Sequence, residues 1–428
     1  MMSAAITLLL FILLAFGMPV AFALVVSGAV GLYWIGGLDV LAGVITTTPL
    51  STAGSYELIS IPMFILMAEF VILSGVADDL FKAASTWVGR VPGGLGMATA
   101  LAGAGFGAIS GSSTASAATL SSTTMPAMLK AGYDPKLAGG VVAISGTLAM
   151  LIPPSIALVL YGIIADVSIG QLLIGGVIPG ILVTLTIMAT VWALVTIDPS
   201  AAPRGSAYTM GEKFRSLKVV GPMIVLFMMV TGVIYTGIAT PTEASGLGAF
   251  GAFALAIREG KVNRASLVKA LTHAAHASCM IFLIIVGARI FGYFFALTQA
   301  TQDVVGAISA WHVSPYVVLA IIVVIYLILG AIMDQIAILI LTIPVVLPVM
   351  KALGFDPIWF GVLVIVIAEI GLLTPPVGLN VFVVARYTGR STREVFAGIW
   401  PHVFAHLILI AILIAFPSLI TWLPSQME

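Results

Sequence analysis

Hydroxyl side chains gather in one short, uncharged stretch of this chain: Ser112, Ser113 and Ser116. Further along, Pro153 and Pro154 interrupt an apolar segment, and Ser155 follows them. Two adjacent prolines remove two backbone donors and free the carbonyl groups of the preceding turn, so a helix is expected to break there. Hydroxyls and freed carbonyls together offer an all-oxygen ligand set, which suits a hard cation such as Na⁺.

The same proline punctuation returns later in the chain. Pro375 and Pro376 lie 222 residues after the first pair, again inside an apolar run. The register holds without a gap elsewhere, because Asp134-Pro135 matches Asp356-Pro357 and Pro19 matches Pro241. We interpret the chain as two diverged copies of one unit of roughly 200 residues.

The second copy carries different polar groups at the corresponding places. Asp334 stands in its hairpin region, and Thr374, Gly378 and Asn380 surround its proline pair. A carboxylate at the bilayer centre costs about 2.5–3.5 kcal/mol even on translocon scales, so we expect Asp334 to be functional. Structural readings stay open: small-residue helix packing uses the same residue types as the serine cluster, and a hairpin end would let Asp334 meet water.

Four other charged residues lie in or beside apolar runs. We interpret them as structural partners that cap helix ends or brace domains: Glu69, Glu243, Arg289 and Glu369. The histidines are scattered and form no ligand set.

Composition identifies the solvent of the chain. Of 428 residues, 61% are hydrophobic and 8% are charged, and the mean hydropathy is +1.21, whereas soluble domains are roughly 25% charged. The sequence therefore predicts an all-α polytopic membrane protein. A net charge of zero gives a nucleic-acid partner no electrostatic support, and the single Cys279 excludes a disulfide framework.

The repeat divides the chain into three parts. Repeat one is predicted at 1–200 and repeat two at 219–423, joined by a hydrophilic, cytoplasmic linker at 201–218. Each repeat is expected to hold a re-entrant hairpin and an interrupted helix, at about 93–125 and 138–164 in repeat one and at about 315–350 and 358–385 in repeat two. The first hairpin region is too polar and glycine-rich for a lipid-facing helix, so protein or a water-filled cavity must receive it.

Positive charges alternate between the copies. The second copy carries Arg258, Lys261, Arg264 and Lys269 where the first has no basic residue at 36–48, whereas Lys82 and Arg90 have no counterpart at 304–312. By the positive-inside rule, the copies lie in opposite orientations, with the N-terminus in the periplasm. The basic segment 258–276 is predicted to lie along the interface.

Inverted repeats with paired discontinuous helices are typical of secondary transporters, whose sites form near the bilayer midplane. An ancient duplication in a channel or scaffold, with prolines that merely kink helices, is the alternative from another class. No phosphate loop, H-E-x-x-H or G-x-S-x-G motif is present, so we predict no enzyme and an ion gradient as the energy source.

Five ordered motifs also carry a resemblance that covers essentially the whole chain: Ile61-Pro62-Met63-Phe64-Ile65-Leu66, Gly111-Ser112-Ser113-Thr114-Ala115-Ser116, Ile152-Pro153-Pro154-Ser155, Thr240-Pro241-Thr242-Glu243-Ala244 and Thr374-Pro375-Pro376-Val377-Gly378-Leu379-Asn380. In this order they resemble the large membrane subunit of tripartite ATP-independent periplasmic (TRAP) transporters.

The resemblance implies an elevator-type fold similar to the ion transporter superfamily, in the bacterial inner membrane. Na⁺ would drive uptake of a small organic acid anion, a carboxylate or sulfonate, delivered by a periplasmic substrate-binding protein. A small four-helix membrane subunit would be the second partner. A stand-alone Na⁺/dicarboxylate symporter or exchanger of a related two-hairpin fold is the alternative.

The resemblance also implies site residues. The first Na⁺ site would be framed by Ser112, Ser113, Ser116, Pro153 and Pro154. The second Na⁺ site would be framed by Asp334, Thr374, Pro375, Gly378 and Asn380. The substrate would sit between the hairpin tips, near Ser113, Ser155, Asp334 and Asn380.

Overall fold

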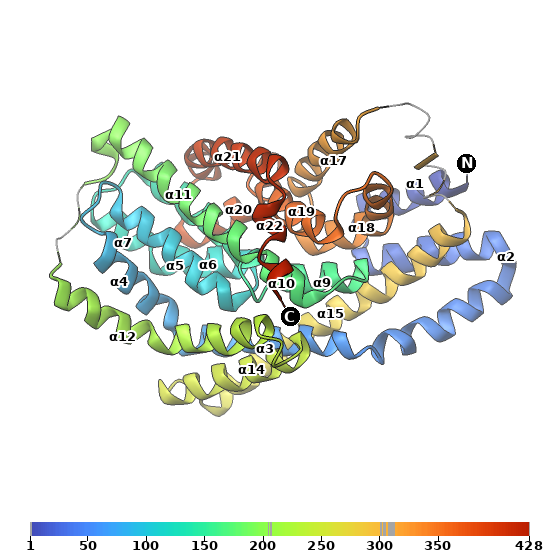
Figure 1. The fold of residues 1–428 in the computed structure, drawn as a ribbon, viewed down its shortest axis with the longest axis horizontal. Coiled ribbons are helices and arrows are strands. Elements are labelled where there is room, and N and C mark those ends of the chain that lie inside the picture. The colour runs from blue at the N-terminus through green and yellow to red at the C-terminus, as the bar shows by residue number, and fades with distance from the viewer. Residues whose placement is uncertain are drawn as a thin grey trace.

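The computed structural model describes residues 2–203, 205, 208–299, 302, 305–306 and 313–427. These residues form helices joined by turns, with no strand in the ranges just given, which confirms the all-α prediction (Figure 1). The stretch 307–312, part of the charge comparison above, lies outside the described residues.

Within the described part, seven helical segments are long and apolar enough to cross a membrane. The shorter apolar helices include several halves of the predicted hairpins and interrupted helices, such as Gly94–Ser110 and Ile156–Ala165, whereas Gln335–Ala352 of the second hairpin is one of the seven. A length criterion misses the shorter halves because each helix stops partway. The chain is thus a multi-pass membrane protein.

Four long helices make one body of the molecule, here called the scaffold: α2 (Val20–Ala53), α3 (Ser60–Ser74), α14 (Pro241–Arg258) and α15 (Arg264–Leu297). The predicted break at Gly17-Met18-Pro19 separates α1 (Met2–Ala15) from α2. α2 continues beyond the first apolar run and bends at Gly36 and Gly37, where Gly37 takes a φ of +65°. Figure 1 shows its two limbs folded back at one end of the molecule.

In the scaffold, helices of the first copy pack against helices of the second copy. α2 packs along α15, and α3 packs along α14. Glycine permits the close approach of α2 and α15, because a Cβ at Gly28 would lie 2.9 Å from the backbone nitrogen of Phe291, and one at Gly287 would lie 2.8 Å from the Ala21 carbonyl oxygen. Each copy therefore depends on the other for its packing surface.

The basic segment 258–276 does not form a separate interfacial helix. Arg258 ends α14, and residues from Arg264 onward belong to the continuous α15. The Asn263 side chain caps that helix, and no residue between 264 and 276 breaks it. The prediction of a separate segment was wrong, because amphipathic charge cannot show whether a helix continues into the next apolar run. The place of these residues along the interface stays a prediction.

Two helix pairs, each joined by a short turn, occupy the predicted hairpin regions: α5 (Gly94–Ser110) with α6 (Ser113–Thr123), and α17 (Pro315–Gly330) with α18 (Gln335–Ala352). The interrupted helices follow: α8 (Pro135–Thr147), η2 (Leu148–Met150) and α9 (Ile156–Ala165), then α19 (Pro357–Gly371) and α20 (Leu379–Thr388). Pro153-Pro154 and Pro375-Pro376 are both cis.

These elements also pack across the copies. α6 lies against α20, and α18 lies against α9. The glycine-rich α5 packs on the first interrupted helix, since a Cβ at Gly103 would lie 2.7 Å from the Ser145 carbonyl oxygen and one at Gly107 would lie 2.8 Å from the Ala149 nitrogen. In the second copy Gly330 and Gly371 meet in the same manner. The hairpins and interrupted helices form a second body, here called the core domain.

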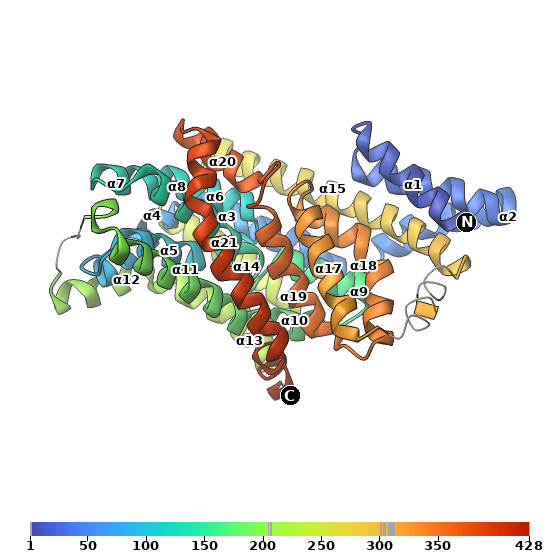
Figure 2. The same ribbon diagram turned by 90° about the horizontal axis from the view of Figure 1, so that it is seen from above.

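The remaining elements enclose the core domain or link the copies: η1 (Tyr56–Ile59), α4 (Val76–Val88), α7 (Met125–Lys130), α10 (Ile169–Gly175), α11 (Val177–Ile197), η3 (Pro199–Ala201), α12 (Met210–Phe227), η4 (Met228–Gly232), α13 (Val233–Tyr235), α21 (Thr392–Ala415), α22 (Ser418–Thr421) and η5 (Pro424–Gln426). Figure 2 shows α21 running beside α19 and α20, which it contacts together with α8.

We predict that the contact between α8 and α21 tolerates no added side chain. A Cβ at Gly398 would lie 1.8 Å from the Lys136 carbonyl oxygen, and such overpacking costs roughly 1–3 kcal/mol or more. Gly398→Ala should therefore lower the thermal unfolding midpoint of the detergent-solubilised protein, followed by tryptophan fluorescence. Gly43→Ala is the control, because nothing lies within 4 Å of that Cβ. Equal midpoints for the two variants would contradict the packing described.

Candidate functional site

Four helices of the core domain begin at the hairpin tips and helix breaks. Three of them are capped by side chains: Ser112 Oγ accepts from Ala115 N at 3.4 Å, Ser155 Oγ from Leu158 N at 3.2 Å, and Asp334 Oδ2 from Ile336 N at 3.1 Å. The fourth, α20, begins after Gly378, whose φ is +62°. A helix N-terminus carries about half a positive charge, which favours anions nearby.

A hydrogen-bond network joins the copies at the centre of the core domain. Asn380 Nδ2 donates to Ser113 Oγ at 2.7 Å. Ser113 Oγ in turn donates to Glu369 Oε2 at 3.2 Å. All three side chains are buried. The first hairpin is thereby tied to both halves of the second interrupted helix.

Several acceptor oxygens at this centre have no partner. Glu369 Oε1, Asn380 Oδ1 and Gln335 Oε1 are buried and receive no hydrogen bond from the described residues. The Gln335 side chain lies beside α19, since its Nε2 donates to the Ile365 carbonyl oxygen at 3.4 Å, one turn before Glu369. Buried acceptors without a donor are costly. A hard cation would be a suitable partner for oxygen atoms of this kind, so these oxygens fit the predicted Na⁺ as ligands.

The residues predicted for the first Na⁺ site lie in two segments, the tip of the first hairpin and the first helix break. Ser116 Oγ and Ser110 Oγ form a 2.7 Å hydrogen bond below the tip of the first hairpin. A Cβ at Gly111 would lie 3.4 Å from the Pro154 carbonyl oxygen, so the tip rests against the first break. Ser155 is buried there, and its hydroxyl donates to the Met150 carbonyl oxygen. That bond commits the Ser155 proton to the protein.

The residues predicted for the second Na⁺ site are brought together less completely. Val377 N donates to the Ala331 carbonyl oxygen at 3.1 Å, which ties the second break to the second hairpin tip. Thr374 Oγ1 donates to the Gly371 carbonyl oxygen at 2.9 Å. Asp334 and Pro375 are exposed at the tip and the break, whereas Asn380 is buried toward Ser113. Asp334 makes no hydrogen bond to Thr374 or Asn380 among the described residues.

Sequence reasoning placed Glu369 and Gln335 outside the site. Glu369 was assigned a bracing role, and its hydrogen bond from Ser113 does join the first hairpin to α19, within the central network. A signal was available, since Glu369 is the one acidic residue within the apolar span 357–371. Gln335 stands 222 residues after Ser113 and is its counterpart in the second copy. The other two acidic residues fit the structural reading, with Glu243 in a capping box with Thr240 and Glu69 Oε2 3.7 Å from His273 Nδ1.

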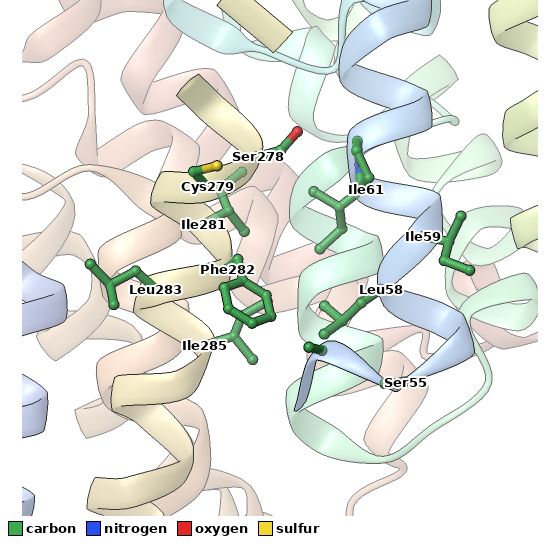
Figure 3. A pocket seen from close by; sticks show the side chains of 12 residues that line it. Ser55, Leu58, Ile59, Ile61, Ser278, Cys279, Ile281, Phe282, Leu283 and Ile285 are labelled. Carbon is green, nitrogen blue, oxygen red and sulfur yellow. The ribbon is translucent and has the colours of Figure 1, made fainter. Parts of the chain in front are cut away.

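An apolar pocket outside the core domain does not share this chemistry. It lies between the start of α3 and the middle of α15, with a volume of about 510 Å³. Figure 3 shows the side chains of Leu58 and Ile61 facing those of Phe282 and Ile285 across it. Its polar side chains are Ser55, Ser278 and Cys279, and no charged group lines it. The described lining of this pocket is therefore mainly apolar.

We expect Ser113→Ala and Asn380→Ala to be energetically coupled. Each removes one partner of a buried hydrogen bond, and contacting residues couple by about 0.5–3 kcal/mol in double-mutant cycles. Reversible unfolding in mixed micelles measures the four corners of the cycle. Ser122→Ala paired with Asn380→Ala is the control, because Ser122 is on the same helix and bonds only the Ala118 carbonyl oxygen. Additive effects for the Ser113 pair would contradict the network.

Comparison with known proteins agrees with this architecture. Residues 7–419 match the family described as "Tripartite ATP-independent periplasmic transporter, DctM component". The chain is 33% identical over 376 residues, 87% of each chain, to the C4-dicarboxylate TRAP transporter large permease protein DctM of Pseudomonas aeruginosa. It is 30% identical, over 95% of each chain, to the 2,3-diketo-L-gulonate TRAP transporter large permease protein YiaN of Escherichia coli.

Among solved structures, the YdaH transporter of Alcanivorax borkumensis matches with a TM-score of 0.65 over 90% of each chain, at 14% identity. That likeness concerns the fold. The family match and the relatives cover most of the sequence, and the helices form the expected polytopic architecture. The chain therefore belongs to the DctM component family of tripartite ATP-independent periplasmic transporters, and it is a transporter permease and not an enzyme.

Proposed function

We propose that this chain is the large membrane subunit of a Na⁺-coupled uptake system for a small organic acid anion in the bacterial inner membrane. A periplasmic substrate-binding protein delivers the anion, and a small four-helix membrane subunit completes the complex. The coupling ions bind around the two hairpin tips, and the anion binds between them.

One observation carries this proposal: four helix N-termini and a set of unpartnered buried oxygens occur in the same core domain. In secondary transporters, N-termini of half-helices point at anionic groups of the substrate, while unwound carbonyls and helix C-terminal ends hold Na⁺. The N-termini of α6, α9, α18 and α20 supply the first kind of group. The carbonyls near the two breaks supply the second kind, and the side-chain oxygens Glu369 Oε1 and Asn380 Oδ1 add further ligands for a cation.

The arrangement of two bodies supports elevator movement. The scaffold helices α2, α3, α14 and α15 pack mainly on one another, and the hairpins pack mainly on the interrupted helices. The network of Ser113, Glu369 and Asn380 lies wholly within the core domain. The core domain would then carry both hairpin tips as one rigid unit past the scaffold.

The relatives support the class of substrate and the partners. Their names include C4-dicarboxylate, sialic acid and isethionate TRAP transporters, whose substrates bear a carboxylate or a sulfonate. The chain covers 64% of the isethionate permease protein DctMQ of Oleidesulfovibrio alaskensis, which supports a further membrane component. We infer no particular anion, because the binding protein is expected to set specificity.

Uptake into proteoliposomes tests the proposal. The permease, purified with its small subunit, is reconstituted, and radiolabelled organic anions are offered with and without the cognate binding protein. We expect uptake only when the binding protein and an inward Na⁺ gradient are both present. Equal uptake without the binding protein would point to a stand-alone symporter, and unchanged uptake with K⁺ in place of Na⁺ would remove the sodium coupling.

Asp334→Asn should weaken the dependence on Na⁺ in the same assay. Loss of a charged ligand is worth roughly 1.5–3 kcal/mol, so the Na⁺ concentration for half-maximal uptake should rise about tenfold or more. Asp39→Asn is the matched control, since Asp39 is exposed on α2 in the scaffold. An unchanged Na⁺ requirement in Asp334→Asn would exclude this carboxylate from the ion site.

A further inference from the structure

A second cavity, which has an arginine in its lining, lies at the boundary between the scaffold and the core domain. Its volume is about 330 Å³, within the range of roughly 300–1,000 Å³ typical of small-molecule sites. One wall is a stripe of α15 that includes Arg289 and Tyr293. The opposite wall comes from the core domain, with Ile163 and Ile164 of α9 and Pro344 of α18.

Arg289 is the charged group that lines this cavity, and it has no partner among the residues that the structure describes. No hydrogen bond or salt bridge within 4.0 Å joins its guanidinium to any residue in the ranges that the structure describes. Its side chain is half-buried, and the residues before and after it are buried. Intramembrane cations are rare and usually pair with an acid or mark a substrate pathway. No acidic side chain in the described ranges pairs with Arg289.

Snorkelling toward the headgroups does not account for this position. Arg289 lies eight residues before the end of α15 at Leu297 and twenty-five after its start at Arg264. At 1.5 Å per residue these separations are about 12 Å and about 38 Å along the helix. Arg289 instead lines the cavity between the scaffold and the core domain.

Two helices that begin at the central site, α9 and α18, also line this cavity further along. α9 and α18 begin at the Ser155 cap and the Asp334 cap, and their cavity residues come eight and ten positions later. At 1.5 Å per residue, this is a distance of about 12–15 Å along the helices. Arg289 therefore lies at the boundary of the core domain, about two to three helical turns from these N-termini as measured along α9 and α18.

We propose that Arg289 forms a second anion-binding site, on the scaffold, that holds the carboxylate or sulfonate of the transported molecule outside the central site. This inference rests on the proposed organic-anion transport and adds a site to it. A guanidinium suits both groups, because its planar fork donates two parallel hydrogen bonds to a carboxylate or a sulfonate. The Tyr293 ring and hydroxyl, one turn further along α15, offer a second contact on the same wall.

Local protection from alkylation tests this site without requiring transport. The full-length permease, with Cys279→Ser removing its single cysteine, carries Ile164→Cys in the cavity wall and is reconstituted in phosphatidylcholine nanodiscs without Na⁺. Succinate or isethionate is then compared with chloride at equal ionic strength. We expect either organic anion to slow the reaction of the new cysteine with N-ethylmaleimide.

Arg289→Gln should raise the anion concentration that halves the alkylation rate by about tenfold or more, because a charged hydrogen-bond partner is lost. Arg289→Lys should retain part of the protection. Arg264→Gln, an exposed site on the same helix, is the matched control and should retain all of it. Full protection in Arg289→Gln, or none in the parent, would overturn the proposal.

Phosphatidylglycerol nanodiscs distinguish cargo from lipid. Protection that needs this lipid and ignores the added anions would assign Arg289 to a headgroup and overturn the cargo site. The uptake experiment above fails or succeeds independently of these readings. Protection without coupled uptake would keep the anion site and remove the proposed function, whereas uptake without protection would do the reverse.

Discussion

A helix that breaks inside a membrane exposes backbone N–H and C=O groups that hydrocarbon cannot satisfy, and this constraint governs the whole fold. The two proline pairs make such breaks unavoidable. The structure therefore surrounds each break with protein: the first hairpin tip rests on Pro154, and the second hairpin tip bonds Val377. The need to cover the broken helices with protein also brings unsatisfied polar groups together in the core domain, where they are available to a ligand.

The two copies share a backbone plan but differ in the chemistry they bring to the centre. Ser113 of the first hairpin meets Asn380, whereas the counterpart of Asn380 in the first copy is Leu158. Glu369 likewise corresponds to Thr147. The second interrupted helix thus carries the amide and the carboxylate, while the first contributes hydroxyls and carbonyls. The two copies therefore contribute different side chains to the centre, although their helices follow the same order.

The sequence predicted the features that depend on spacing and failed where tertiary contacts decide. The proline pairs and their constant offset located the interrupted helices, because proline acts on its own backbone wherever it stands. The partner of Glu369 was not predicted, since nothing in an apolar helix shows which neighbour its carboxylate will face. The continuity of α15 past residue 276 was also missed. Its first turns are polar and the turns that follow are apolar, but the backbone hydrogen bonds are helical throughout, so the change in polarity does not mark the end of a helix.

The continuity of α15 sets a mechanical condition on the scaffold. Its 34 residues span about 51 Å, against a hydrocarbon core of roughly 30 Å. Even a tilt of 40°, the upper end of the usual range, leaves about 39 Å along the membrane normal. The helix must therefore reach into the headgroup layer, and its basic first turns are the part suited to do so. A thicker or thinner bilayer would change the tilt of this helix, and with it the height of the scaffold wall that faces the core domain.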